Sequence, residues 1–192
     1  MKITPAYYYL TAAAKVGLAV LSLLLIFLFN YCHISHPIMM FVSYALAIVS
    51  ALIVPFFFLM IFLEHKNDDQ LSIVSLSIVG FVAVLVIFRD LIYLFQNYIS
   101  IPSIFYRLLS LSGIITMYGV FLEIIAVLLL GKIFIKKYNL ILPVVVSCVL
   151  LILSFYPLAS VVSRWIPNLI YSVAFAFLMF SYGKKREQVG SN

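Results

Sequence analysis

Residues 38–63 read IMMFVSYALAIVSALIVPFFFLMIFL, an apolar run without a single charged side chain. A helix needs about 20 predominantly apolar residues to cross the hydrocarbon core of a bilayer, and this run exceeds that length. The strict alternation of polar and apolar positions that a membrane β-barrel requires is absent from it. The stretch therefore predicts a transmembrane helix.

Five further stretches have the same character and fill most of the chain. Of its 192 residues, 66% are hydrophobic and 9% are charged, and the mean hydropathy is +1.24. A soluble domain of this size leaves roughly 30% of its surface exposed, so water is an unsuitable solvent for this composition. The sequence predicts one all-α membrane domain over residues 1–192, a six-transmembrane-helix bundle with short loops. The predicted spans are residues 10–31, 38–63, 71–95, 108–130, 140–156 and 166–182.

The lysine and arginine residues are distributed unevenly between the two predicted membrane faces. Arg107 and Arg164 fall on one face, and Arg89 lies within or just below its surface. The face that carries both termini holds the other nine of the 12, which are Lys2, Lys15, Lys66, Lys132, Lys136, Lys137, Lys184, Lys185 and Arg186. Because lysine and arginine accumulate on the cytoplasmic side, both termini are predicted to be cytoplasmic. We expect a multi-pass protein of a bacterial plasma membrane, in which the net charge of +6 reflects orientation rather than nucleic-acid binding.

Polar stretches mark the predicted connections on this face. Residues 64–70, EHKNDDQ, are the most polar run of the chain and predict a loop, and residues 131–139 predict a basic loop. Residues 183–192 predict a short polar tail. No cleavable signal peptide is evident, so the first apolar run is expected to remain as the first span.

Glu123 is the leading candidate for a functional site, because a charge inside a membrane costs about 3 kcal/mol on insertion scales. Ser112, Thr116, Gly119 and Glu123 follow one another at i, i+4, i+7 and i+11, so they share one face of the fourth span. Two interpretations stay open. Glu123 binds a proton, a cation or a ligand amine, or it is a buried carboxyl group that is protonated or paired and holds helices together. Lys15 is a possible partner, although it lies close enough to the surface to snorkel.

Arg89, Tyr93 and Gln96 define a second polar face, at the outer end of the third span. One interpretation is an anion or headgroup site that opens outward. The other is that the apolar span ends at Phe88 and that Arg89 sits at the interface. Asp90 is adjacent to Arg89 in sequence but is rotated about 100° from it on a helix, so it is not automatically its partner.

Cys32, His33 and His36 form a weak candidate metal cluster, in which two imidazoles and a thiolate lack an obvious fourth ligand. A solvated loop explains them better, and we predict no metal and no cofactor. Cys148 is the second cysteine of the chain. It is predicted to lie at a different depth from Cys32, so a disulfide between them is not expected.

No motif of a membrane enzyme is present, because the chain lacks G-x-S-x-G, H-E-x-x-H and the P-loop. We therefore expect a non-enzymatic, sensor-like or accessory membrane module. It would lie in the lipid bilayer and bind a small or lipophilic ligand, or a partner membrane or cytoplasmic protein. We do not expect it to bind nucleic acid. The alternative is a small-solute transporter or its substrate-binding subunit, and an enzyme that uses Glu123 or the Cys32 cluster has least support. An open path from water to Glu123 favours transport or catalysis, whereas a closed interior favours sensing or structure.

Overall fold

The computed structural model describes residues 3–31, 37–65, 70–95, 112–155 and 165–190. The described residues form helices joined by turns, as the sequence predicts. The segments are α1 (Pro5–Tyr31), α2 (Pro37–His65), α3 (Leu71–Phe95), α5 (Ser112–Leu129), the π-helix η1 (Lys132–Lys137), α6 (Ile141–Phe155) and α7 (Trp165–Gly190). Helix α2 runs without interruption through Pro55.

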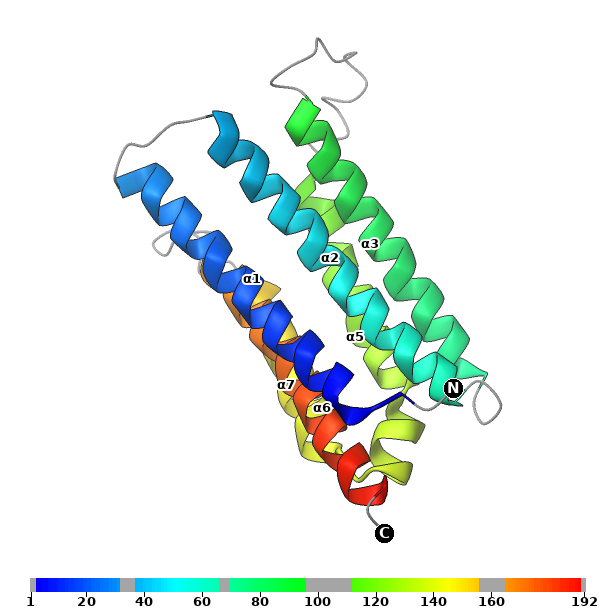
Figure 1. Cartoon of the computed structure of the whole chain (residues 1–192). Helices are drawn as coiled ribbons and strands as arrows, with labels where there is room; N and C mark the ends of the chain where they lie inside the picture. The colour runs from blue at the N-terminus through cyan, green and yellow to red at the C-terminus, as the bar shows by residue number, and fades with distance from the viewer. Residues whose placement is uncertain (1–2, 32–36, 66–69, 96–111, 156–164, 191–192) are drawn as a thin grey trace.

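The helices form a closed ring. Each long helix packs against the one that follows it in the sequence, and α7 returns to pack along α1 in the most extensive contact of the bundle. Figure 1 shows the helices side by side, with the N-terminus and the C-terminus at the same end of the bundle. The ring therefore encloses an interior that all six α-helices line.

Four of the helices are long and apolar enough to cross a membrane. They cover Pro5–Leu25, Phe41–His65, Leu71–Phe95 and Ile166–Val189, and two shorter apolar helices cover Tyr118–Leu129 and Ile141–Ser154. Large apolar side chains also face outward, as at Leu142, Val84 and Phe121, which expose 70%, 63% and 62% of their surfaces. Apolar exteriors of this extent are unfavourable in water. Composition and length together suggest an integral membrane protein.

The described helices extend further into the polar stretches than the sequence predicts. Residues 64 and 65 form the last turn of α2 rather than a loop, and α7 continues through the predicted tail to Gly190. The predicted basic loop is largely the π-helix η1, whose Ile133 and Phe134 are buried. The chain turns only afterwards, at Asn139, where φ is 51°. The predictions of loops at these places are wrong because buried contacts at the bundle end hold these residues in helices.

Small residues mark close contacts between helices, as membrane packing requires. Ser147 of α6 donates a hydrogen bond from Oγ to the carbonyl oxygen of Ala174 on α7, at 2.9 Å. A Cβ atom on Gly119 of α5 would lie 3.1 Å from Val82 Cγ1 on α3. These contacts bring helix backbones near enough for polar side chains inside the ring to meet.

Candidate functional site

Four helices bring polar side chains together inside the ring. Lys15 of α1, Ser50 of α2, Glu123 of α5 and Tyr171 of α7 form what we call the buried charge cluster. Lys15 and Glu123 expose only 2% and 4% of their surfaces. Since α1 and α5 are not consecutive members of the ring, the cluster crosses the interior of the bundle.

Groups on two other helices hold the ammonium of Lys15. Its Nζ donates to the carbonyl oxygen of Ser50 at 2.9 Å and to Ser50 Oγ at 3.0 Å. It also lies 4.9 Å from the ring centre of Tyr171, within the range of a cation–π interaction. An ammonium has three N–H donors, and these three contacts can use all of them. The expectation that Lys15 snorkels to the surface is wrong, because the side chain finds these partners inside the bundle.

Tyr171 connects the positive and the negative member of the cluster. Its hydroxyl donates to Glu123 Oε1 at 2.7 Å, while its ring contacts Lys15. Removing one member of a buried hydrogen bond leaves its partner unsatisfied, at a cost of about 1–3 kcal/mol. The cluster therefore ties four helices to one arrangement.

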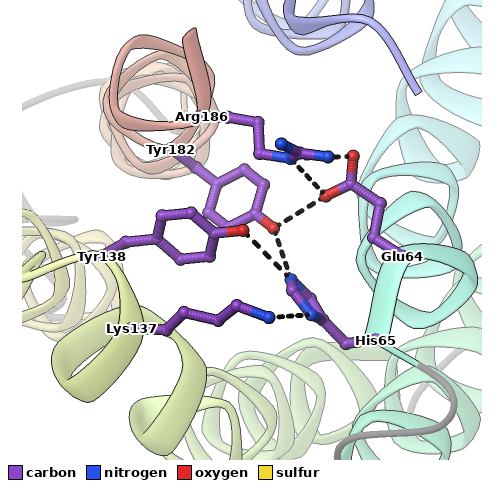
Figure 2. A network of polar contacts seen from close by, with 6 residues as sticks. All are labelled: Glu64, His65, Lys137, Tyr138, Tyr182 and Arg186. Carbon is purple, nitrogen blue, oxygen red and sulfur yellow. Dashed lines mark hydrogen bonds and ion pairs between the residues drawn. The ribbon is translucent and has the colours of Figure 1, made fainter. Parts of the chain in front are cut away.

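A second set of polar side chains lies at the bundle end that holds both termini (Figure 2). We call it the end network, and it consists of Glu64, His65, Lys137, Tyr138, Tyr182 and Arg186. Glu64 accepts a hydrogen bond from the Tyr182 hydroxyl at 3.0 Å. Arg186 Nε lies 3.2 Å from each carboxylate oxygen of Glu64, and the Glu64 side chain is 3% exposed. The network thus fixes the end of α2 to the end of α7.

His65 extends the network from α7 to η1. Its Nδ1 lies 3.2 Å from Lys137 Nζ, and its Nε2 lies 3.0 Å from the Tyr182 hydroxyl and 3.5 Å from the Tyr138 hydroxyl. A charged lysine only donates, so the contact with Lys137 assigns Nδ1 as the acceptor and places the proton of a neutral imidazole on Nε2. Lys137 then donates a hydrogen bond to His65, His65 donates one to Tyr182, and Tyr182 donates one to Glu64.

The start of α1 is fixed to the end of α7 beside this network. A Cβ atom on Gly183 would lie 2.9 Å from Tyr8 Cβ and 3.2 Å from Tyr9 Cε1. The Tyr8 ring packs against Tyr182, with 4.9 Å between ring centres, and the Tyr9 hydroxyl donates to Glu187 Oε2 at 2.8 Å. The absence of a side chain at Gly183 is what permits this approach.

Arg89 pairs with its neighbour in sequence. Arg89 Nε donates to Asp90 Oδ1 at 2.9 Å, and Nη2 lies 2.8 Å from the same oxygen. Tyr93 stacks on Tyr44 of α2, with 6.1 Å between ring centres and 10° between planes. The helical rotation between Arg89 and Asp90 does not prevent pairing, because the long arginine side chain reaches back. With its charge matched in this way, Arg89 is a weaker candidate for an anion site.

Several candidates from the sequence fall outside what the structure describes. Cys32, His33, His36 and Gln96 lie in such segments, as do the side chains of Ser112 and Thr116 at the start of α5. Among the described residues, no three His, Cys, Asp or Glu side chains are grouped in a way that could hold a metal ion.

The partners that complete either set are not predictable from the sequence alone. Tyr171 and Tyr182 lie in an apolar span and at its end, where a tyrosine is ordinarily an interfacial or core residue. Glu64 and His65 fall in a polar run that predicts a loop. One feature of the sequence could have identified Glu64 and His65. Both directly follow an apolar run, and a helix that continues past the run brings them into contact with neighbouring helices.

A comparison of the chain with known protein families, curated proteins and solved structures finds no match in any of the three.

Proposed function

We propose that this chain is a non-enzymatic, sensor-like or accessory module of a bacterial plasma membrane, which binds a small or lipophilic ligand or a partner membrane protein. One observation carries the proposal. The side chains of Lys15 and Glu123 are both enclosed and are hydrogen-bonded to other groups of the protein. A transporter needs a path from water to its binding site, whereas an enclosed cluster that joins four helices suits a module that changes its packing as a unit.

We further propose six transmembrane spans with both termini in the cytoplasm. The ring supports this topology, because α5 and α6 take the places of two spans between α3 and α7. Both termini lie at the same end of the bundle, as an even number of spans requires. The bias of lysine and arginine toward that end supports a cytoplasmic location.

The physical basis of such a module would be a competition for the groups of the buried charge cluster. A ligand amine or carboxylate, or a polar side chain of a partner, could replace Tyr171 at Glu123 or Ser50 at Lys15. Each replacement would remove a contact between two helices. Because a ligand shifts an equilibrium only through different affinities for the two states, this cluster is where we place the coupling. Arg89 and Tyr93, at the other end of the ring, are secondary candidates.

Native mass spectrometry tests the proposal on protein released gently from its own membrane. A protein subunit that stays bound would identify an accessory component, and a stoichiometric small molecule would identify a ligand-binding module. Solute uptake into vesicles that contain only this chain would contradict the proposal and establish a transporter.

Glu123→Gln is the variant to compare, because glutamine keeps the shape and an acceptor for Tyr171 but removes the charge. The matched control is Glu187→Gln, which makes the same change at an exposed site. We expect Glu123→Gln to weaken retention of the bound molecule at least tenfold in a dissociation assay, and Glu187→Gln to leave it unchanged. Equal retention by both variants and the unchanged protein would exclude Glu123 from the site.

A further inference from the structure

Two basic stretches meet at the end of the bundle that carries both termini. One is η1, with Lys132, Lys136 and Lys137, and the other is the last part of α7, with Lys184, Lys185 and Arg186. These six residues are half of the 12 lysines and arginines of the chain. The first stretch is predicted as a loop from the sequence, so the arrangement of its charges comes from the structure.

The π-helix gathers the three lysines of η1 on one side. A helix closed by i→i+5 hydrogen bonds has about 4.4 residues per turn, or about 80° per residue. Lys136 and Lys137 then lie within about 50° of Lys132, whereas in an α-helix Lys137 would be about 140° away. All three lysines are exposed, while Ile133 and Phe134 are buried against the bundle. The π geometry therefore brings the three lysines to one side of η1, with the buried Phe134 about 160° away from Lys132.

Contacts with α2 place both stretches at the boundary of a candidate membrane span. The span in α2 ends at His65. Lys137 contacts His65, and Arg186 pairs with Glu64, as Figure 2 shows. The polar headgroup layers add about 5–8 Å on each side of the hydrocarbon core. In the proposed topology, the lysines beside these contacts would therefore lie level with the end of the α2 span, next to the phospholipid headgroups.

The neighbouring acidic groups are already engaged. Glu64 binds Arg186 and Tyr182, and Glu187 accepts from Tyr9. By contrast, the side chains of four lysines form no hydrogen bond or ion pair with another described residue; they are Lys132, Lys136, Lys184 and Lys185. In sequence, the predicted cytoplasmic face holds eight basic residues besides the buried Lys15, against the acids Glu64, Asp68, Asp69 and Glu187, so positive charge remains even when every acid is paired.

We infer that Lys132, Lys136, Lys184 and Lys185 form a docking surface for the headgroups of anionic phospholipids. Two properties of these lysines favour anionic phospholipids: their positive charge complements the headgroups, and the proposed topology places them beside the headgroup layer. Clustered lysines beside a membrane span attract anionic lipids with about 1 kcal/mol each, or about fivefold in affinity per lysine. The inference rests on the proposed membrane topology and assigns a lipid class to one face of it.

The test uses the full chain in detergent micelles, with equal amounts of phosphatidylglycerol and phosphatidylcholine added. Native mass spectrometry measures the ratio in which the two lipids remain bound. The variant changes all four lysines to glutamine, and a matched control changes all four to arginine, which keeps the charge. Both leave Lys137 and Arg186 of the end network intact.

We expect the unchanged protein and the arginine variant to prefer phosphatidylglycerol. In the glutamine variant, the ratio of bound phosphatidylglycerol to bound phosphatidylcholine should fall at least tenfold. The preference should also fall at high salt, because the Debye length drops from about 10 Å at 0.1 M to about 3 Å at 1 M. Undiminished preference in the glutamine variant overturns the inference, and so does displacement of the lipid by soluble glycerol phosphate at equal concentration. Extraction of the chain without detergent would instead overturn the membrane topology itself, so the two failures are distinguishable.

Discussion

Gly183→Ala gives a direct measure of how closely α1 approaches α7. The added Cβ would lie 2.9 Å from Tyr8 Cβ, a distance that forces something to shift. The contact is with an atom next to the backbone rather than with the flexible end of a side chain, so the helices themselves must separate. Introducing an extra methyl group into a packed site costs about 1–3 kcal/mol.

The same substitution has the opposite sign where there is space. Alanine stabilises a helix over glycine by about 0.5–1 kcal/mol. Gly17 lies on α1, and no other atom is within 4 Å of a Cβ placed there. We therefore expect Gly17→Ala to gain about 0.5–1 kcal/mol. At Gly183 the same gain is offset by the steric cost, which leaves a net loss of about 1 kcal/mol.

Thermal unfolding in detergent micelles, followed by circular dichroism, measures both variants against the unchanged protein. For a chain of this size, 1 kcal/mol corresponds to about 2–4 °C in Tm. We expect Tm to rise for Gly17→Ala and to fall for Gly183→Ala, and the difference between the two variants isolates the steric cost. Equal shifts of the same sign would refute the close approach of α1 to α7.

Three further predictions concern the buried charge cluster and the topology. Glu123→Ala should lower the unfolding free energy by about 1–3 kcal/mol more than Glu123→Gln, because only glutamine still accepts from the Tyr171 hydroxyl; equal losses in thermal unfolding would exclude that hydrogen bond. Tyr171→Phe should keep the ring beside Lys15 and cost about 1–3 kcal/mol, whereas Tyr171→Leu should lose about 0.5–2 kcal/mol more, which unfolding of the two variants side by side compares. With both native cysteines replaced by serine, a membrane-impermeant thiol label applied to intact cells should modify a cysteine introduced at Arg107 but not one at Lys136, and the reverse pattern would invert the topology.

The apolar helices themselves were predictable from local sequence. The span predicted at residues 71–95 coincides with α3, and the second span differs from α2 only at its ends. Apolar runs of this length have one stable conformation in a bilayer, because a helix satisfies every backbone hydrogen bond within itself. The predicted helix ends are wrong where polar residues continue a helix, as in η1 and the last turns of α7. The helical conformation of these polar residues depends on contacts with residues distant in sequence.

The two polar sets were predictable only in part. Glu123 was identified because an acid in an apolar run is costly wherever it lies, and Lys15 was named as its possible partner because it lies near the same predicted membrane side. Tyr171 was not identified, because a tyrosine in an apolar span has no such cost when its hydroxyl finds an acceptor. Its position 48 residues along the chain from Glu123 carries no local signal.

The sequence by itself determined that this chain is helical and apolar, which residues form the helix interiors, and where charge is scarce. These properties depend on composition and on the length of apolar runs, and both are local. Only the tertiary structure decided that α7 closes the ring on α1, that Lys15 turns inward to Ser50 and Tyr171, and that Glu64 and His65 join a network rather than a loop. Those outcomes depend on which helix faces meet, and side chains far apart in the sequence determine that through their packing and hydrogen bonds.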